Sequence, residues 1–460
     1  MPASTVSDAA PVAASSSWYR KATTALFDGA RLDSPRFLLM FWFVARLVVL
    51  GIWALLGLGA QNDVLYYFDH IDALAQVGPA QTMPEYPTPA LWVLWVPWLL
   101  GFGTSVGYTM AFACLMLLLD AAFTYTLWRT GGHRRGQAVI FWTLFLGFIG
   151  PTAYLRFDLI VSVLAGWSLI LIRRDHAGTG GALIGLGAAV KLWPAVLWPA
   201  LCGGHKKTVL RATLGFALVG VVSAGASLLW GGWDRLISPL TYQTDRGLQV
   251  ESVFASVPMF IRSLGLGDYA VTVSRYLAFE IWGTGVQFWL SLASVSVFVG
   301  YGLIAVTYVL WFIRGHGRLR EAAVLMLFAI TVLIVTNKTF SPQYVIWLGS
   351  PLAATFVIMG GRQPHLPSHD GDRLRLRRIT SLVLTLTLAT LLVYPIGYVP
   401  LVNDVTNWMH FLRVPVTVVL VARNCMVIWL MVELALWVAS FLKPKAWAQV
   451  RRPVTNGVSQ

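Results

Sequence analysis

The chain has 460 residues, of which 57% are apolar and only 12% are charged, with 21 Trp residues and a mean hydropathy of +0.68. A soluble domain carries about 25% charged residues, so this composition excludes an ordinary soluble protein and indicates a chain that crosses a membrane several times. Open strands cannot cross lipid, because the bilayer core offers the backbone no hydrogen-bond partners. We therefore predict an all-α polytopic membrane protein.

A net charge of +14 would also suit a nucleic-acid-binding protein. The basic residues, however, cluster between apolar runs, which is typical of cytoplasmic loops. The clusters are Arg20/Lys21/Arg31/Arg36, Arg129/Arg134/Arg135, Arg173/Arg174, Lys206/Lys207/Arg211, Arg314/Arg318/Arg320, Arg362 with Arg373/Arg375/Arg377/Arg378, and Lys443/Lys445/Arg451/Arg452. This distribution argues against nucleic acid as a partner and places both termini in the cytoplasm of a multi-pass plasma-membrane protein.

The N-terminal segment 1–35 is predicted to be a cytoplasmic tail, followed by a first span at 37–59. Because this span leaves the cytoplasm, residues 60–88 are expected on the outer face. This outer segment contains N-D-V-L-Y-Y-F-D-H-I-D at 62–72, with three carboxylates close to the membrane.

Further long apolar runs predict the remaining spans. They lie near 107–128, 137–151, 157–172, 208–230, 285–313, 321–336, 341–360, 379–395 and 424–442. Two other apolar stretches do not fit a simple span. The stretch at 87–100 is short and rich in Pro, which predicts a partial dip or a shortened helix. The stretch at 181–201 lies between two cytoplasmic clusters, so we expect it to enter and return as two half-helices with Lys191 at the tip.

Two further long segments, 231–284 and 396–423, are expected to join residues 60–88 as outer loops. Residues 36–442 then form one transmembrane domain, and residues 443–460 form a cytoplasmic C-terminal tail. Non-helical backbone at membrane depth, as expected at the tip of the 181–201 hairpin, is tolerated only where it is buried in protein or lines a wet cavity. The sequence therefore predicts a cavity toward the outer face.

Some basic residues lie outside the cytoplasmic clusters. They are Arg46, Arg156, Lys191, Arg235, Arg246, Arg262, Arg275, Lys338, Arg413 and Arg423. Arg46 lies within a span, where a bare charge is costly, and we expect it to form a buried pair with Asp120. The others map to outer loops or outer ends of spans, which departs from the usual orientation bias unless something anionic is bound there.

We divide these outer cations by their neighbours in the sequence. The ones expected to be ordinary solvated loop charges are Arg235, Arg262, Arg275 and Arg413. The ones that abut apolar segments, and are predicted to bind an anionic group, are Arg156, Lys191, Arg246, Lys338 and Arg423.

The acids of the outer face suggest acid–base chemistry. Asp63 follows the first span and precedes V-L-Y-Y-F, so it can lie in a cavity within reach of substrate, and we identify it as the candidate general base. Asp69 and Asp72 share one helical face and are expected to be either a solvated rim or part of the site. Residues that are candidates for binding sugar hydroxyls or for stacking on a sugar are Tyr66, Tyr67, Asp69, Glu85, Asp158 and Glu251.

Common nucleotide and hydrolase motifs are absent from the sequence, including the P-loop, G-x-G-x-x-G, H-E-x-x-H and G-x-S-x-G. Acids with cations on the outer face instead suit a lipid-phosphate leaving group and a carboxylate that deprotonates the acceptor. No group of residues has metal-ligand spacing, so we expect neither a metal nor another cofactor.

Several motifs then occur in a familiar order: N-D-V-L-Y-Y, E-Y-P-T-P, L-R-F-D-L, G-L-G-A-A-V-K-L-W-P, R-G-L-Q-V-E-S, N-K-T-F-S-P-Q-Y and A-R-N. Over about residues 37–442 the chain resembles the actinobacterial polyprenyl-phosphate-mannose-dependent mannosyltransferases of glycosyltransferase family 87, in the GT-C superfamily. One departure is T-P at 88–89, where the family more often has a double proline after Tyr.

The resemblance implies a GT-C fold of about ten to thirteen membrane helices, some of them short or re-entrant. It assigns the role of general base to Asp63, and it places Arg156, Lys191 and Lys338 near the donor phosphate. From the long outer loop it places Arg246, Gln249 and Glu251 along the site, with Arg246 as a further cation for the donor phosphate. The candidates for binding the sugar or acceptor then also include Gln249, Asn337 and Gln343, and A-R-N adds Arg423 to the cations.

The implied reaction is inverting transfer of a sugar, mannose, from a polyprenyl-phosphate donor to a glycolipid or glycan acceptor on the extracytoplasmic face. Arabinofuranose is an alternative sugar. A transporter or flippase of a glycolipid is an alternative function, because charged residues and broken helices also mark transport sites. Transporters often repeat a broken segment in both halves, whereas here the two candidates, 87–100 and 181–201, lie in the first half.

Overall fold

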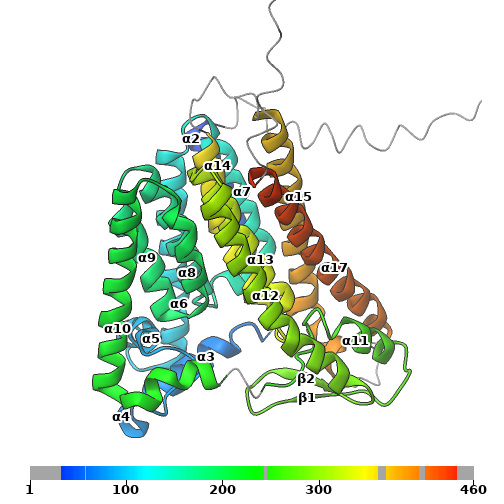
Figure 1. Cartoon of the computed structure of the whole chain (residues 1–460). Coiled ribbons are helices and arrows are strands. Elements are labelled where there is room, and N and C mark those ends of the chain that lie inside the picture. Colours follow the sequence, from blue (N-terminus) through cyan, green and yellow to red (C-terminus); the bar gives the residue numbers. More distant parts are fainter. Residues whose placement is uncertain (1–32, 57–58, 243–245, 361–368, 404–409, 443–460) are drawn as a thin grey trace, which may run out of the picture.

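The computed structural model describes most of the chain as a bundle of helices (Figure 1). The described residues are 33–56, 59–242, 246–360, 369–403 and 410–442. The predicted C-terminal tail, and the predicted N-terminal tail up to residue 32, lie outside this range.

Within the described ranges, nine helical segments are long and apolar enough to cross a membrane. They are α2 (Pro35–Leu56), α6 (Ser105–Thr130), Gly132–Ala153 with α7 (Arg135–Ile149) at its centre, α10 (Lys206–Thr241), α12 (Val286–Arg314), α13 (Leu319–Thr336), Pro342–Met359 with α14 (Ile346–Met359), α15 (His369–Leu391) and α17 (His410–Phe441). The predicted class, a helical multi-pass membrane protein, is confirmed.

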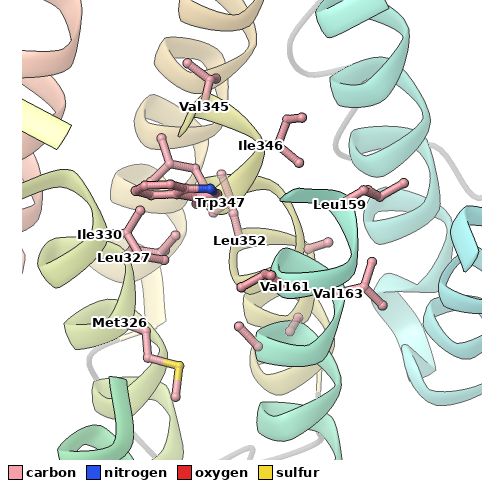
Figure 2. Packing of buried hydrophobic residues seen from close by; sticks show 14 of the residues in the cluster. Leu159, Val161, Val163, Met326, Leu327, Ile330, Val345, Ile346, Trp347 and Leu352 are labelled. Carbon is pink, nitrogen blue, oxygen red and sulfur yellow. The ribbon is translucent and has the colours of Figure 1, made fainter. Parts of the chain in front are cut away.

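The centre of the bundle is formed by α8 (Asp158–Arg173), α13 and α14. These helices are apolar on nearly all sides, as expected for helices that are surrounded by other helices. Figure 2 shows Val161 on the side of α8 that faces Leu352 of α14 and Ile330 of α13, whereas Leu159 points to the opposite side of α8. The packed core fixes the ends of these helices, which carry several predicted site residues.

The lipid-facing surface lies on the outer helices of the bundle. Leu39 of α2, Leu229 of α10 and Phe298 of α12 are exposed large apolar side chains, which suits contact with hydrocarbon rather than water. Where α10 packs against α9 (Ala177–Val190), small residues allow close approach: a Cβ at Gly181 would overlap the backbone of Ala212.

Both short apolar stretches are helical and short, as the sequence predicts. The first is α5 (Thr88–Leu100), which has Pro89 in its first turn. In the second, α9 ends at Val190, and Lys191 takes an extended conformation, with φ −152° and ψ 116°. The return arm is a 3-10 helix, η4 (Trp193–Gly203), rather than an α-helix. Its prolines remove backbone N–H donors, which accounts for this difference.

The expected outer loops are more ordered than predicted. They contain α3 (Asn62–Asp72), α4 (Leu74–Val77), α11 (Ser256–Ser263), strands β1 (Ala270–Val273) and β2 (Phe279–Trp282), the η6 turn (Leu392–Ile396) and α16 (Tyr398–Val402). All of these lie at one end of the bundle, at the bottom of Figure 1, which we call the site end. Two of the predicted loop boundaries were wrong. Helix α10 continues to Thr241, through Gly232 at φ +76°, into the segment predicted as the 231–284 loop. Helix α17 begins at His410, within the segment predicted as the 396–423 loop.

The strands correct the expectation that no part of the chain is β-structure. A-V-T-V and F-E-I-W are rich in β-branched and aromatic residues, and they pair antiparallel from Ala270 with Trp282 to Val273 with Phe279. The cost of unpaired backbone groups in lipid does not exclude this hairpin, because residues 270–282 lie outside the helices that could cross the membrane. Its Ile281 packs in a second apolar cluster with Leu248, Val250 and Leu401, which attaches the hairpin to the bundle.

Arg46 and Asp120 form the predicted buried pair. Nε of Arg46 lies 2.7 Å from Oδ2 of Asp120, and Nη2 donates to Oδ1 at 2.9 Å. Asp120 also accepts hydrogen bonds from Trp142 Nε1 and the Tyr154 hydroxyl. With several charge-assisted hydrogen bonds, the pair links α2 to α6 and α7 without a bare charge in the apolar core.

Replacing Arg46 by Met is expected to lower the free energy of unfolding by about 3–5 kcal/mol, because Asp120 would remain buried without its cation. Thermal unfolding in detergent checks this loss. The double variant Arg46→Met/Asp120→Asn should recover part of it, and Arg314→Met, at an exposed residue, should be close to wild type. An Arg46→Met protein as stable as wild type would contradict the structural role of the pair.

Candidate active site

Helix termini bring the predicted site residues to the site end. Asp63 lies in the first turn of α3 and Asp158 in the first turn of α8, where the helix dipole favours a negative charge. Lys191 lies at the break between α9 and η4. Helix ends leave backbone groups without partners and present side chains beyond the apolar core. This is why the polar residues gather at one end of an otherwise apolar bundle.

The central contact of the site is an ion pair between Asp63 and Arg156. Oδ2 of Asp63 lies 2.6 Å from Nε of Arg156; the carboxylate side chain is 40% exposed, whereas the Arg156 side chain is only 4% exposed. The cation therefore holds the carboxylate from inside the protein. The exposed side of Asp63 remains open to a substrate.

The other N–H groups of Arg156 are used inside the protein. Nη1 donates to the carbonyl oxygens of Ala60 and Leu155 at 2.8 and 2.9 Å, and Nη2 donates to the Tyr394 hydroxyl at 3.1 Å. A guanidinium has five N–H donors in a rigid fork. Arg156 thus fixes the residues just before α3 at the same time as it holds Asp63.

Lys191 and Asp158 form a second pair. Nζ of Lys191 lies 2.8 and 2.9 Å from the two carboxylate oxygens of Asp158, and Trp347 Nε1 donates to Oδ1 at 2.6 Å. The Lys191 side chain is 15% exposed, whereas Asp158 is buried. The structure thus brings a partly accessible ammonium next to the Asp63 region.

Aromatic rings surround the Lys191 ammonium. Nζ lies 5.0 Å from the ring centre of Phe157 and 5.5 Å from that of Tyr86, with Tyr344 and Trp347 at 6.0 and 5.9 Å. Ring faces attract a cation, and they also exclude water. Electrostatic interactions with an arriving anion are stronger in such a site than in bulk solvent.

Tyr66 and Glu85 form a third contact, beside Asp63. The Tyr66 hydroxyl donates to Oε1 of Glu85 at 2.7 Å. Burial, together with the Glu85 charge, raises the pKa of Tyr66 well above its ordinary value, so the hydroxyl stays protonated and remains a donor. The neighbouring Tyr67 is buried and packs on Phe157 at 5.4 Å between ring centres. Tyr67 therefore supports the site from within the packed core, whereas the Tyr66 ring is partly accessible.

Three of the four cations that were expected to be solvated are buried instead. Arg235 is 1% exposed, and its guanidinium donates to the carbonyl oxygens of Met83 and Tyr86 and to Thr88 Oγ1. Arg262 and Arg413, both under 9% exposed, donate to the carbonyl oxygens of Leu401 and Asn403. Arg275 is exposed as predicted. The buried three stabilise loops, because carbonyl oxygens are ready acceptors for a guanidinium.

Gln249 joins the 246–252 loop to the turn at 337–344. Its side-chain oxygen accepts a hydrogen bond from the Phe340 backbone N–H at 2.7 Å. The backbone N–H of Gln249 donates to the Lys338 carbonyl oxygen at 3.2 Å. The side chain of Asn337 accepts from the N–H and hydroxyl of Thr339. Both predicted amides therefore shape the turn, which leaves the side chains of Lys338 and Gln343 half-buried.

Glu251 and Arg423 pair with each other in the interior. Nη1 of Arg423 lies 2.6 Å from Oε2 of Glu251, and both side chains are 0% exposed. Asn424 donates to the carbonyl oxygens of Glu251 and Ser252, and the Arg423 guanidinium lies 4.2 Å from the ring centre of Phe340. Burial raises the pKa of Glu251, which Arg423 opposes. We call Gln249, Glu251, Phe340, Arg423 and Asn424 the brace.

Replacing Arg423 by Met is expected to lower the free energy of unfolding by about 3–5 kcal/mol, because Glu251 would be left buried without its cation. Thermal unfolding in detergent checks this. The double variant Glu251→Gln/Arg423→Met should recover part of the stability. Unchanged stability of the single variant would contradict the structural role of the pair.

Two predicted site residues, Arg246 and Asp69, lie closer to the surface at the site end. The Arg246 guanidinium lies 5.5 Å from the ring centres of both Tyr242 and Tyr276, and it is half-buried. Asp69 is exposed on α3, one turn beyond Tyr66. The structure therefore does not bring Asp69 into contact with Asp63 or Glu85.

Two tyrosines that the sequence analysis missed connect the Asp63 region to the brace. Tyr394 bonds to Arg156, and its ring meets that of Tyr398 at 4.9 Å between centres. Tyr398 is half-buried. Desolvation raises the pKa of its hydroxyl, and the charges of Glu251 and Asp63 raise it further. The available signal was L-V-Y-P-I-G-Y, because a hydroxyl at the predicted end of an apolar span needs a polar partner.

Comparisons with known proteins were made for the whole chain. A search of curated proteins finds no match. Two crystal structures of ArnT from Cupriavidus metallidurans are similar: the form bound to undecaprenyl phosphate has 14% identity over 87% of this chain and 78% of that chain, with a TM-score of 0.43. The apo form has 12% identity over 81% and 72%, with a TM-score of 0.38. Residues 85–342, more than half of the chain, match the family model of glycosyltransferase family 87. The chain therefore belongs to glycosyltransferase family 87.

Proposed function

We propose that the protein is an inverting enzyme that moves mannose from a polyprenyl-phosphate donor to a lipid- or glycan-linked acceptor on the extracytoplasmic face. Family membership supplies the reaction class, transfer of a sugar. The observation that supports the mechanism is the Asp63 carboxylate, 40% exposed and held by the buried Arg156. A fixed carboxylate that substrate can reach is suited to act as a general base.

In the proposed reaction, Asp63 takes the proton of an acceptor hydroxyl while that oxygen attacks the anomeric carbon. The bond between this carbon and the phosphate oxygen breaks, and the lipid phosphate leaves with the electron pair. The attack comes from the side opposite the leaving group, so a β-linked donor gives an α-linked product. The proton on Asp63 can then pass to solvent through its exposed side.

Lys191 is the cation best suited to the leaving phosphate. An ammonium has three N–H donors, and the Asp158 oxygens account for two of them. The aromatic surroundings strengthen its attraction to developing negative charge. The side chains of Lys338, in the turn at 337–344, and of Arg246 can approach the same phosphate. Arg156 and Arg423 instead pair with Asp63 and Glu251 within the protein. We therefore assign Arg156 to the base and Arg423 to the brace.

Helix α8 supports the proposed orientation in the membrane. Its first turn carries Asp158, and its last turn carries Arg173, next to Arg174; over 16 residues these ends lie about 24 Å apart. Basic residues favour the cytoplasmic side, so Asp158 and the site end would face outward. The choice of mannose rests on the family resemblance of the motifs.

The experiment is a transfer assay with purified protein, a crude extract of envelope glycolipids as acceptor, and three separate labelled donors. We expect label in product from polyprenyl-phosphate β-mannose, and none from polyprenyl-phosphate β-arabinofuranose or GDP-mannose. Transfer from GDP-mannose would contradict the lipid-linked donor. Transfer from the arabinofuranose donor alone would keep the mechanism and replace the sugar.

A further inference from the structure

Glu85 has one carboxylate oxygen with a partner and one without. Oε1 accepts the hydrogen bond of Tyr66, whereas Oε2 is enclosed by protein and accepts a hydrogen bond from none of the described residues. An enclosed carboxylate oxygen without a donor destabilises the folded state. Such an atom in a native site calls for an explanation, and a bound ligand that donates a hydrogen bond would satisfy it.

Glu85 also lies close to the proposed base. Tyr66 is three residues after Asp63 on α3, so the two side chains share one helix face. The charges of Glu85 and Asp63 both act on the Tyr66 hydroxyl. A ligand group that reaches Oε2 of Glu85 would therefore be next to the atoms that Asp63 serves.

The loop that carries Glu85 is held in place. Arg235 binds the carbonyl oxygens on both sides of it, at Met83 and Tyr86, with distances of 3.1 and 3.0 Å. Nε of Arg235 binds Thr88 at the start of α5. The Arg235 guanidinium thus fixes the loop through the loop's backbone carbonyl groups. None of these hydrogen bonds goes to Oε2 of Glu85.

The charge of Glu85 selects the kind of ligand. A phosphate would be repelled, because both groups are negative. A sugar hydroxyl can donate to a carboxylate in a charge-assisted hydrogen bond. Tyr66 joins Glu85 to the face of α3 that carries Asp63. Because Asp63 is proposed to act on the acceptor hydroxyl, this arrangement favours the acceptor.

We propose that Glu85, positioned by Tyr66, binds a hydroxyl of the acceptor glycan next to the hydroxyl that Asp63 deprotonates, and so determines which acceptor hydroxyl receives the sugar. This inference rests on the proposed transfer reaction, and it adds a residue that selects the acceptor. Arg235 acts through the loop and is a positioning residue.

The test compares Glu85→Gln and Tyr66→Phe with wild type and with Asp72→Asn. Asp72 is an exposed carboxylate of the same helix that accepts a bond from Trp98, and it is the matched control. The probe is polyprenyl-phosphate β-mannose, with the glycolipid that wild type glycosylates as acceptor. The readouts are the KM of each substrate, the rate of donor hydrolysis to free sugar, and the linkage of the product.

Loss of a charge-assisted hydrogen bond is expected to raise the acceptor KM of both variants about 10-fold or more, while the donor KM changes by less than about twofold. Donor hydrolysis should persist, so the ratio of hydrolysis to transfer should rise, and Glu85→Gln should produce a second linkage. A merely structural change would lower hydrolysis and transfer together.

A raised donor KM with an unchanged acceptor KM would overturn the inference and assign Glu85 to the donor sugar. Wild-type values and a single linkage in both variants would overturn it as well. Tyr66→Phe keeps the carboxylate, so it still tests the inference if Glu85→Gln does not fold. If wild type itself transfers nothing, the proposed function fails; if wild type transfers and Glu85→Gln matches it, only this inference fails.

Discussion

Replacing Asp63 by Asn is expected to lower the rate of sugar transfer by about 10³-fold or more, because an amide cannot accept the proton of the acceptor hydroxyl. Asn keeps the size of the side chain, and its oxygen can still face Arg156, so the protein should fold. The kcat of the purified variant, measured with saturating donor and acceptor, checks this. The variant should also still bind the donor, because Lys191 and Asp158 are unchanged.

Asp72→Asn provides the control for this measurement as well. It removes one carboxylate from the same helix, α3, at an exposed position without contact to Arg156, and it should retain wild-type transfer. A folded Asp63→Asn protein with more than about a tenth of wild-type kcat would refute the assignment of the base, since general-base catalysis contributes about 10²–10⁴-fold.

Replacing Lys191 by Met is expected to lower kcat by about 10²–10³-fold, because the leaving phosphate would lose its nearest preorganised cation. The donor KM should change less than kcat, since negative charge on the bridging oxygen grows as the bond to the sugar breaks. Steady-state kinetics with a varied donor concentration separate these two effects.

Lys191→Met also leaves Asp158 buried without its cation, which destabilises the fold. The double variant Lys191→Met/Asp158→Asn removes that charge, and Trp347 can still donate to the amide oxygen. We expect the double variant to regain thermal stability but not activity. Recovery of activity together with stability would mean that Lys191 only neutralises Asp158 and does not serve the phosphate.

The parts of the structure that could be predicted from sequence are those set by the cost of burying charge in lipid. Arg46 within an apolar run required a partner, and Asp120 is that partner. The 181–201 stretch could not be a simple span between two basic clusters, and the chain breaks at Lys191 as predicted. In both cases the bilayer leaves few alternatives.

The parts that could not be predicted depend on contacts between loops distant in sequence. Arg235 was expected to be solvated, but its loop partners at Met83 and Tyr86 are about 150 residues away along the chain, with separations of 152 and 149 residues. The hairpin of β1 and β2 was missed because the lipid argument concerns spans only. Tertiary burial of this kind leaves no periodic pattern in the sequence.

Two charged residues in the family motifs, Glu251 and Arg423, were predicted to contact substrate but pair with each other instead. Q-V-E-S and A-R-N contain a carboxylate and a cation at the outer ends of apolar segments, which suggested substrate contacts. In the structure Glu251 and Arg423 satisfy each other and are fully buried. Sequence alone could not show this pairing, because the two residues lie 172 positions apart.

Membership of family 87 identifies the protein as a membrane glycosyltransferase of the GT-C type, and a transporter function is not needed to explain its intramembrane charges. Arg46 and Asp120 neutralise each other within the bundle. Asp63 with Arg156, and Asp158 with Lys191, form two further ion pairs at the site end.

In the proposed mechanism one carboxylate, that of Asp63, promotes a single displacement at the anomeric carbon. The most direct test is the anomeric configuration of the product that wild-type protein makes from a polyprenyl-phosphate β-mannose donor labelled with ¹³C at the anomeric carbon, read from the one-bond carbon–hydrogen coupling. We expect an α-linked mannoside, formed with inversion. A β-linked product would mean retention, by two displacements or by attack from the face of the leaving group, and it would contradict a single inverting displacement with Asp63 as the general base.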